Sequence, residues 1–187
     1  MILLAALALS FIVALARGGR LSTLEHWLPV HGWLPGLALL IQVLVVALHP
    51  PASGVIVALL GTSLVLLLTF VILNLGLPGM ALLGSGLALN LVAIAANGGW
   101  MPVNPGALER AGLHALASLP QGSLLEGSKD ILLEAEHARL WWLGDIIPLP
   151  PPISVVLSLG DLLVAAGGAW FWQKALFPRP NLTADEG

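Results

Sequence analysis

Long apolar stretches constrain this chain more than any other feature of its sequence. Five such stretches cover residues 2–16, 34–48, 53–75, 79–96 and 157–176. A membrane-spanning helix needs about 20 consecutive, mainly apolar residues, so the stretches predict helices of that order of length. The composition agrees with this prediction, because 58% of the residues are hydrophobic and only 9% are charged. A soluble domain has about 25% charged residues.

The stretches predict an all-α fold, namely a polytopic transmembrane helical bundle of about five spans in one membrane domain, residues 1–187. Residues 98–156 are expected to form a small extracytoplasmic cap, and residues 177–187 a disordered tail. Within the cap, Asn104-Pro105 has the pattern of a helix start and predicts a helix that ends near Leu119. Residues 129–143 fit both a helical and an extended pattern, and the sequence leaves that choice open.

Positive charges beside the apolar stretches predict the orientation of the chain. Arg17 and Arg20 follow the first stretch, while Lys174 and Arg179 flank the end of the last one. Short cytoplasmic loops carry an excess of lysine and arginine, so these four residues are assigned to the cytoplasmic side. We therefore expect a multi-pass protein of the bacterial cytoplasmic (inner) membrane, with its N-terminus and cap outside and its C-terminus inside.

The fourth apolar stretch is rich in small residues, which indicates close packing. Gly84 and Ala88 are four positions apart, and small residues at this spacing allow the backbone of another helix to approach. We therefore predict that Gly84 and Gly86 lie against a neighbouring helix, with the fourth stretch at the centre of the bundle.

Polar residues within or beside the apolar stretches are candidates for structural or binding roles. Gln42, Asn74 and Asn90 could line a path for a substrate or ion, or they could join helices through hydrogen bonds. Asn97-Gly98-Gly99 has the pattern of a helix terminus. The same three residues could instead form a backbone nest that binds an anion.

Two Leu-Gly-Asp triplets, ending in Asp145 and Asp161, bracket a proline-rich bend. Asp161 is the only carboxylate within the apolar stretches, and a charge at membrane depth is costly. If Asp145 and Asp161 meet, they could share a proton and supply both the acid and the base that activate a water molecule. In the alternative interpretation, Asp161 caps the last helix and Asp145 closes a turn.

Other classes of site are disfavoured by the composition. The chain has no cysteine, which excludes disulfides and thiolate metal sites. Its five histidines lack the spacing of paired ligands on a helix, so no metal and no cofactor are expected. The net charge of −3 and the absence of a basic cluster argue against nucleic acid as a partner.

Three segments resemble one bacterial membrane-protein family that is described only as a domain of unknown function. They are Arg17-Gly18-Gly19-Arg20-Leu21, the segment from Leu89-Asn90-Leu91 to Asn97-Gly98-Gly99-Trp100-Met101-Pro102, and residues 140–167 with both Leu-Gly-Asp triplets. The segments occur in matching order over nearly the whole chain. The resemblance implies a five-helix integral membrane protein and supplies no activity and no catalytic residue.

The placement of the two aspartates is also similar to that in lipoprotein signal peptidase, a membrane aspartyl protease. That family has one aspartate after its third span and a second in an Asn-x-Ala-Asp motif at the start of its last span. Here Ser158-Leu159-Gly160-Asp161 stands in place of that motif, and the match covers about thirty residues. The similarity implies Asp145 and Asp161 as a catalytic pair.

Three classes of function follow from these observations. We expect a structural or interaction component of the cell membrane, whose partners are the lipid bilayer and other membrane-protein subunits. The alternative is a membrane-embedded aspartyl hydrolase or peptidase that uses Asp145 and Asp161. A small-solute carrier is the third class, for which the sequence offers no internal repeat and few intramembrane charges.

Overall fold

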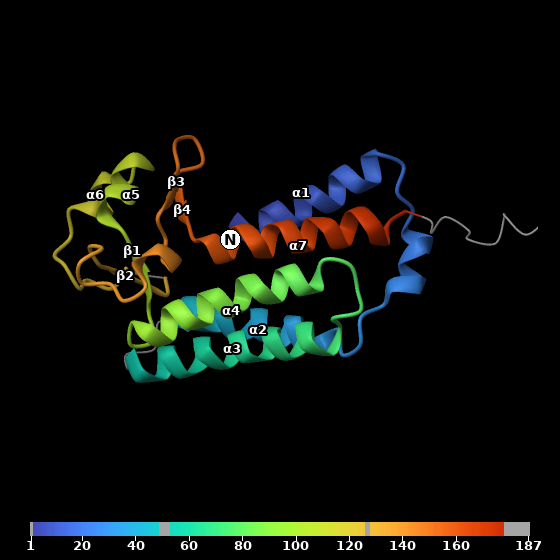
Figure 1. Cartoon of the computed structure of the whole chain (residues 1–187), viewed down its shortest axis with the longest axis horizontal. Coiled ribbons are helices and arrows are strands. Elements are labelled where there is room, and N and C mark those ends of the chain that lie inside the picture. Colours follow the sequence, from blue (N-terminus) through green and yellow to red (C-terminus); the bar gives the residue numbers. More distant parts are fainter. Residues whose placement is uncertain (1, 49–52, 126–127, 178–187) are drawn as a thin grey trace, which may run out of the picture.

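A computed structural model describes residues 2–48, 53–125 and 128–177 of the chain. Each of the five apolar stretches forms one long helix, and the chain is mostly helical. The five are α1 (Ile2–Ala16), α2 (Trp33–Leu48), α3 (Ser53–Leu73), α4 (Met80–Ala96) and α7 (Leu159–Ala175). They lie side by side as a bundle, and residues between α4 and α7 form a cap at one end (Figure 1). The N-terminal end of α1 lies at the same end as the cap.

The helices of the bundle differ in their capacity to cross a membrane. Within the described residues, the segment Gly54–Leu73 of α3 is the one helix that is both long and apolar enough, with a mean hydropathy of 2.8. Ala5–Ala16, Trp33–Leu48 and Met80–Ala96 are apolar but shorter. A mostly helical fold is therefore established. One described helix meets the length and hydropathy of a membrane span, so five spans are not established.

Helices α4 and α7 form the closest pair, and glycines bring their backbones together. A Cβ atom added to Gly167 would lie 2.6 Å from the carbonyl oxygen of Gly79, and one added to Gly160 would lie 2.6 Å from that of Gly86. The prediction for Gly86 is confirmed, because an added Cβ there would collide with Gly160. We call these four glycines the glycine seam.

The predicted pair of Gly84 and Ala88 has a different role from the one expected. Gly84 faces α3, where an added Cβ would lie 2.7 Å from a methyl group of Val71, so its predicted contact with another helix is confirmed. Ala88 is exposed and takes no part in the seam. The spacing that brings α4 against α7 is therefore seven residues and not four.

The apolar core of the bundle lies between α3, α4 and α7. Its buried side chains include Phe70 and Val71 from α3, Met80 and Leu87 from α4, and Val164 from α7. Because the backbones of α4 and α7 are so close, these side chains project to the sides of the seam and fill the spaces beside it.

The end of the bundle opposite the cap is closed by the short helix η1 (Leu21–Trp27). The guanidinium group of Arg17 donates a hydrogen bond of 2.9 Å to Gln173 Oε1 on α7. The backbone N–H of Arg20 donates to the carbonyl of Leu176 at 2.7 Å, and Thr23 Oγ1 donates to the carbonyl of Ala175 at 2.7 Å. The first loop and the end of α7 are thus fixed to each other.

The cap contains short strands as well as short helices, so the all-α prediction is wrong for this part of the chain. Its elements are β1 (Met101–Val103), α5 (Pro105–Arg110), α6 (His114–Ala117), β2 (Asp130–Leu132), η2 (Trp141–Leu143), β3 (Ile147–Leu149) and β4 (Val155–Leu157). Strands β1 and β2 pair in parallel, with Met101 opposite Asp130. Strands β3 and β4 form an antiparallel hairpin.

Two local predictions in the cap can be compared with the structure. The helix expected from Pro105 to Leu119 is interrupted after Arg110, because Gly112 adopts a left-handed conformation with φ of +80° that breaks the helical hydrogen-bond pattern. Residues 129–143, left open between helix and extended chain, contain strand β2 and then the 3₁₀ turn η2. Of the predicted tail 177–187, residues 178–187 lie outside the described part of the chain.

Candidate functional site

Asp161 lies in the first turn of α7, where it forms a capping box with Ser158. The Oγ atom of Ser158 accepts a hydrogen bond from the N–H of Asp161 at 3.0 Å, and Asp161 Oδ2 accepts one from the N–H of Ser158 at 3.1 Å. These bonds satisfy two backbone donors that a helix start leaves without partners. The structure thus places Asp161 in the capping position that the sequence allowed.

Asn90 connects this capping box to α4. Its Nδ2 atom donates to Asp161 Oδ1 at 3.0 Å, and its Oδ1 atom accepts from Ser158 Oγ at 2.9 Å. All three side chains are buried. Asn90 therefore joins two helices, and both carboxylate oxygens of Asp161 already accept hydrogen bonds.

Asp145 is in a different environment, in the cap just after η2. Its backbone pairs with β1, since its N–H donates to the carbonyl of Pro102 at 2.8 Å and its carbonyl accepts from the N–H of Asn104 at 3.1 Å. Its side chain is only 6% exposed, yet the Oδ1 atom has no hydrogen-bond partner among the described residues. A buried acceptor without a donor is unfavourable by about 1–3 kcal/mol.

Asp130 and Lys129 are the charged neighbours of Asp145 that the sequence did not single out. The pairing of β2 with β1 and of Asp145 with Val103 brings all three residues to the same part of the cap. Ser128 Oγ donates to Asp130 Oδ2, whereas Asp130 Oδ1 has no partner within the described chain. No spacing in the sequence links residue 130 to residue 145, because they meet only through strand pairing.

The charges of this cluster perturb one another. Burial raises the pKa of the Asp145 carboxyl well above its ordinary value; Lys129 opposes this change, while Asp130 and Asp161 add to it. Burial alone would lower the pKa of Lys129, but the carboxylates of Asp130, Asp145 and Asp161 outweigh it and raise that pKa. Lys129 therefore keeps its charge, and Asp145 holds its proton more tightly than an ordinary aspartate.

A cavity of about 220 Å³ adjoins this cluster, and both Asp130 and Asp145 line it. The carboxylate that shares the cavity with Asp145 is thus Asp130, whereas Asp161 is absent from the lining. The predicted pairing of Asp145 with Asp161 remains a prediction. Electrostatic interaction between the two groups is present, but Asp161 is engaged in the capping box.

Asn97 fastens the cap to the end of α4. Its Oδ1 atom accepts from the N–H of Arg139 at 2.9 Å, and its Nδ2 atom donates to the carbonyl of Arg139 at 2.8 Å. Gly98 and Gly99 follow in left-handed conformations, with φ of +72° and +96°. An added Cβ on Gly99 would collide with Val57 of α3, so this segment ends the helix and packs against α3.

Two further polar candidates also join elements. Gln42 Nε2 of α2 donates to Ser63 Oγ of α3 at 3.1 Å. Asn74 binds both backbone groups of Val30, as acceptor at 2.7 Å and donor at 2.9 Å. Within the described ranges, no group of three or more His, Cys, Asp or Glu side chains is arranged to hold a metal ion.

The fold and site define the class of the protein: a bundle of five apolar helices that carries a small mixed cap with a partly acidic cavity. The chain belongs to the family of unknown function DUF5317, which matches residues 30–173. This match agrees with the resemblance to an uncharacterised family. No curated protein matches the chain, and no solved structure matches it.

Proposed function

We propose that the protein is a multi-pass component of the bacterial cytoplasmic membrane and that it acts by association with other membrane proteins. The observation that carries the proposal is the exposure of large apolar side chains on the bundle helices. Ile12 of α1, Val43 of α2 and both Val65 and Ile72 of α3 are all more than half exposed. Exposed apolar side chains of this kind are stable in lipid or against another apolar helix.

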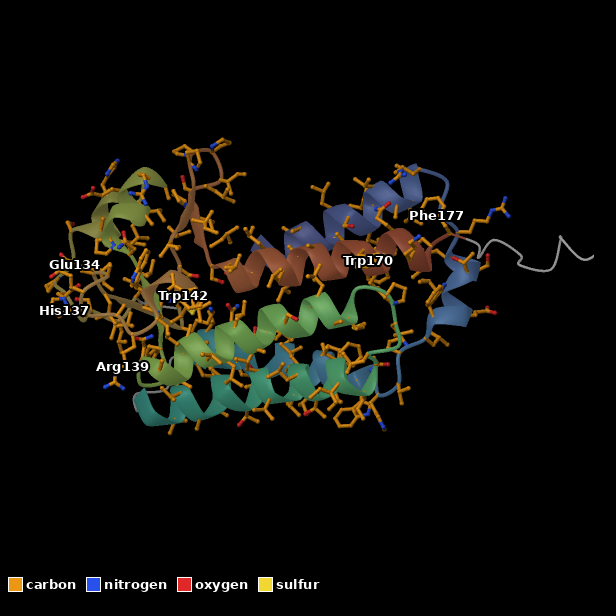
Figure 2. The ribbon with its side chains drawn as sticks, in the orientation of Figure 1. Glu134, His137, Arg139, Trp142, Trp170 and Phe177 are labelled. Carbon is orange, nitrogen blue, oxygen red and sulfur yellow. The ribbon has the colours of Figure 1, made fainter. Side chains whose placement is uncertain are left out.

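Helix length is consistent with this proposal. At about 1.5 Å per residue, α3 is about 32 Å long and the other four helices are about 23–26 Å long, against a hydrocarbon core of about 30 Å. The shorter helices require modest thinning of the bilayer or contributions from flanking residues. Trp170 near the end of α7 and Trp142 in the cap lie toward opposite ends of the bundle (Figure 2), as interfacial aromatic residues do.

The orientation that we propose places the cap outside. Arg17, Arg20 and Lys174 gather at the opposite end, where the first loop is hydrogen-bonded to the end of α7. Positive charge at that end supports its assignment to the cytoplasm. Five spans then leave the N-terminus outside and the C-terminus inside.

Cysteine accessibility labelling in intact cells tests the membrane topology, because the chain has no native cysteine. Ser118 in the cap and Ser22 in η1 are both exposed and lie toward opposite ends of the bundle. We expect Ser118→Cys to react with an impermeant thiol reagent and Ser22→Cys to react only after permeabilisation. The reverse pattern would invert the topology, and extraction of the protein from membranes by alkaline carbonate would refute membrane integration.

Helix α3 supports an interaction role. Gly54 and Gly61 are seven residues apart, like the glycines of the seam. Among the described residues, no atom lies within 4 Å of a Cβ added at either position. Together with the apolar surface beside them, this open glycine pair suits the close approach of a helix from another subunit.

An aspartyl hydrolase that uses Asp145 and Asp161 is the second candidate. The raised pKa of Asp145 and its unpartnered oxygen favour it, since perturbed carboxyl groups are typical of catalytic sites. Both oxygens of Asp161 accept hydrogen bonds in the capping box, which argues against a catalytic role for that residue.

Complementation of a deletion strain separates the two functions. We expect Asp161→Asn to restore growth at normal protein abundance and Gly61→Leu to fail although the protein is present and folded. Loss of function in Asp161→Asn at normal abundance would favour the hydrolase. Full function of Gly61→Leu would refute the proposed interaction through this face of α3.

A further inference from the structure

The cavity of the cap has an apolar wall. Val103 of β1, Leu108 of α5, and Leu113 and Leu116 at α6 line it, together with Leu125 and Val156. Most of these side chains belong to or pack against the core of the cap. The interior is thus suited to a hydrocarbon body, and its volume of about 220 Å³ exceeds the roughly 150 Å³ cavity in which an engineered protein binds benzene.

One side of the same cavity is polar, because Ser128, Asp130, Asp145 and Ser154 line it. Asp145 is more than nine-tenths buried, and its Oδ1 atom is without a hydrogen-bond partner in the described chain, as is Oδ1 of Asp130. The hydroxyl of Ser128 is already committed to Asp130 Oδ2. Each of the two carboxyl groups that line the cavity thus has an oxygen without a donor among the described residues, and a ligand with donors of its own suits such a site.

The charged groups around Asp145 favour one sign of charge on that ligand. Asp130, Asp161 and Lys129 act on Asp145 electrostatically, so this cluster of described residues sets one cation against three acidic groups. An anionic ligand would add to the excess of negative charge in the site. A cation would reduce it.

The chemistry of the wall narrows the class of cation. Mg²⁺ and Ca²⁺ require about six or more oxygen ligands, which a wall of leucine and valine does not provide. A zwitterionic lipid headgroup would bring a phosphate into the same apolar and acidic surroundings. An ammonium group supplies three donors, enough for both unpartnered oxygens.

We propose that the cap binds a small organic monocation, an ammonium group carried directly on a hydrocarbon body of about 6–10 non-hydrogen atoms. In this arrangement the ammonium group donates to the carboxyl groups of Asp145 and Asp130, and the hydrocarbon lies against the leucine and valine wall. The site is a binding site for which no reaction is proposed.

Isothermal titration of the full-length protein in detergent with benzylamine tests the site. Benzyl alcohol and benzoate have the same ring, with a neutral and an anionic head respectively, and a protein-free micelle titration corrects for partition into detergent. We expect saturable binding of benzylamine, at least tenfold tighter than binding of either control compound. Equal affinity for benzyl alcohol, or no saturable binding of benzylamine, would overturn the proposal.

Variants locate the binding. Asp145→Asn and Asp130→Asn should each weaken benzylamine at least tenfold, and Leu116→Trp should block it by filling the cavity while keeping both carboxylates. Glu134→Gln removes one charge from an exposed position at the outer end of the cap (Figure 2) and should leave the affinity within twofold. Undiminished binding in Asp145→Asn or in Leu116→Trp would refute the proposal, and a thermal melt of each variant shows that it is folded. If Asp145→Asn does not fold, the affinities of Asp130→Asn and Leu116→Trp for benzylamine test the proposal, and undiminished binding in both would refute it.

Discussion

Asp145 combines deep burial with an incomplete set of hydrogen bonds. The residue is 6% exposed, one of its carboxyl oxygens has no hydrogen-bond partner among the described residues, and burial raises its pKa. The folded chain therefore binds the proton of Asp145 more tightly than the unfolded chain does. A group of this kind lowers the free energy of unfolding at neutral pH. A ligand that binds the folded state through donors and positive charge raises that free energy again.

We predict that Asp145→Asn raises the free energy of unfolding at pH 7.5, because the amide is neutral whereas burial opposes ionisation of the Asp145 carboxyl group and raises its pKa. Between the ordinary pKa of an aspartate and the raised pKa of the folded state, the unfolded chain holds fewer protons, so stability falls as pH rises. The difference between variant and wild type should therefore vanish below about pH 4. Thermal melts in detergent at pH 7.5 and below about pH 4 measure this difference in stability. Glu136→Gln, at an exposed position, is the control. A variant that is less stable at pH 7.5 would contradict this assignment.

Asn90 should matter more to stability than the charge of Asp161. Asp161→Asn can keep one of its two side-chain hydrogen bonds and should cost about 0.5–2 kcal/mol. Asn90→Leu leaves Asp161 Oδ1 without its donor and Ser158 Oγ without its acceptor, so we expect a loss of about 2–6 kcal/mol, the sum for two unsatisfied groups. Melting temperatures rank the two variants. Ser85→Ala, at an exposed residue of the same helix, should be nearly neutral, and a silent Asn90→Leu would show that the network is dispensable.

At the scale of the elements, glycines determine how α4 and α7 pack. We predict that Gly167→Leu destabilises the protein by at least about 3 kcal/mol, because backbone atoms of α4 occupy the space that the side chain needs. Gly61→Leu on α3 meets open space among the described residues and should not lower the melting temperature. An unchanged melt for Gly167→Leu would mean that the two helices can separate at little cost.

Sequence reasoning locates the long helices well and the cap poorly, for physical reasons. The apolar stretch predicted at 34–48 corresponds to Trp33–Leu48 and that at 79–96 to Met80–Ala96, because a continuous apolar run is itself the signal. The strands of the cap are three residues long, too short to show an alternating pattern. Asp130 lines the cavity only because β2 pairs with β1, and the sequence does not reveal strand partners.

At the scale of the whole molecule, two asparagines attach irregular segments to helix ends. Asn97 binds both backbone groups of Arg139 in the cap, and Asn74 binds both backbone groups of Val30 at the far end. Each also donates to a carbonyl of the helix that it follows: Asn97 to that of Ala93 and Asn74 to that of Phe70. Each side-chain amide thus takes the place of a peptide group in a strand pair.

We predict that Asn97→Ala loosens the cap while the bundle stays intact. The amide of Arg139 loses its acceptor in this variant. Hydrogen–deuterium exchange should therefore become at least tenfold faster at Arg139 and at neighbouring amides, and should be unchanged in the middle of α7. Asn74→Ala serves as the reciprocal control, since it should affect Val30 and leave Arg139 unaffected. Faster exchange throughout α7 in Asn97→Ala would show that the cap and bundle unfold together.

The spacing of the glycine seam determines a handedness for the molecule. Seven residues correspond to two turns of 3.5 residues, whereas a straight α-helix has 3.6, so a contact line with this repeat drifts by about 20° per heptad. Helices α4 and α7 are therefore expected to coil around each other in a left-handed sense. A screw displacement of α7 by one residue, about 1.5 Å along its axis with a rotation of about 100°, would bring the sequence neighbours of Gly160 and Gly167 to the contact in their place. Side chains would then meet backbone where glycines now do, so the seam opposes movement of α7 along the bundle axis and holds the two helices in one register.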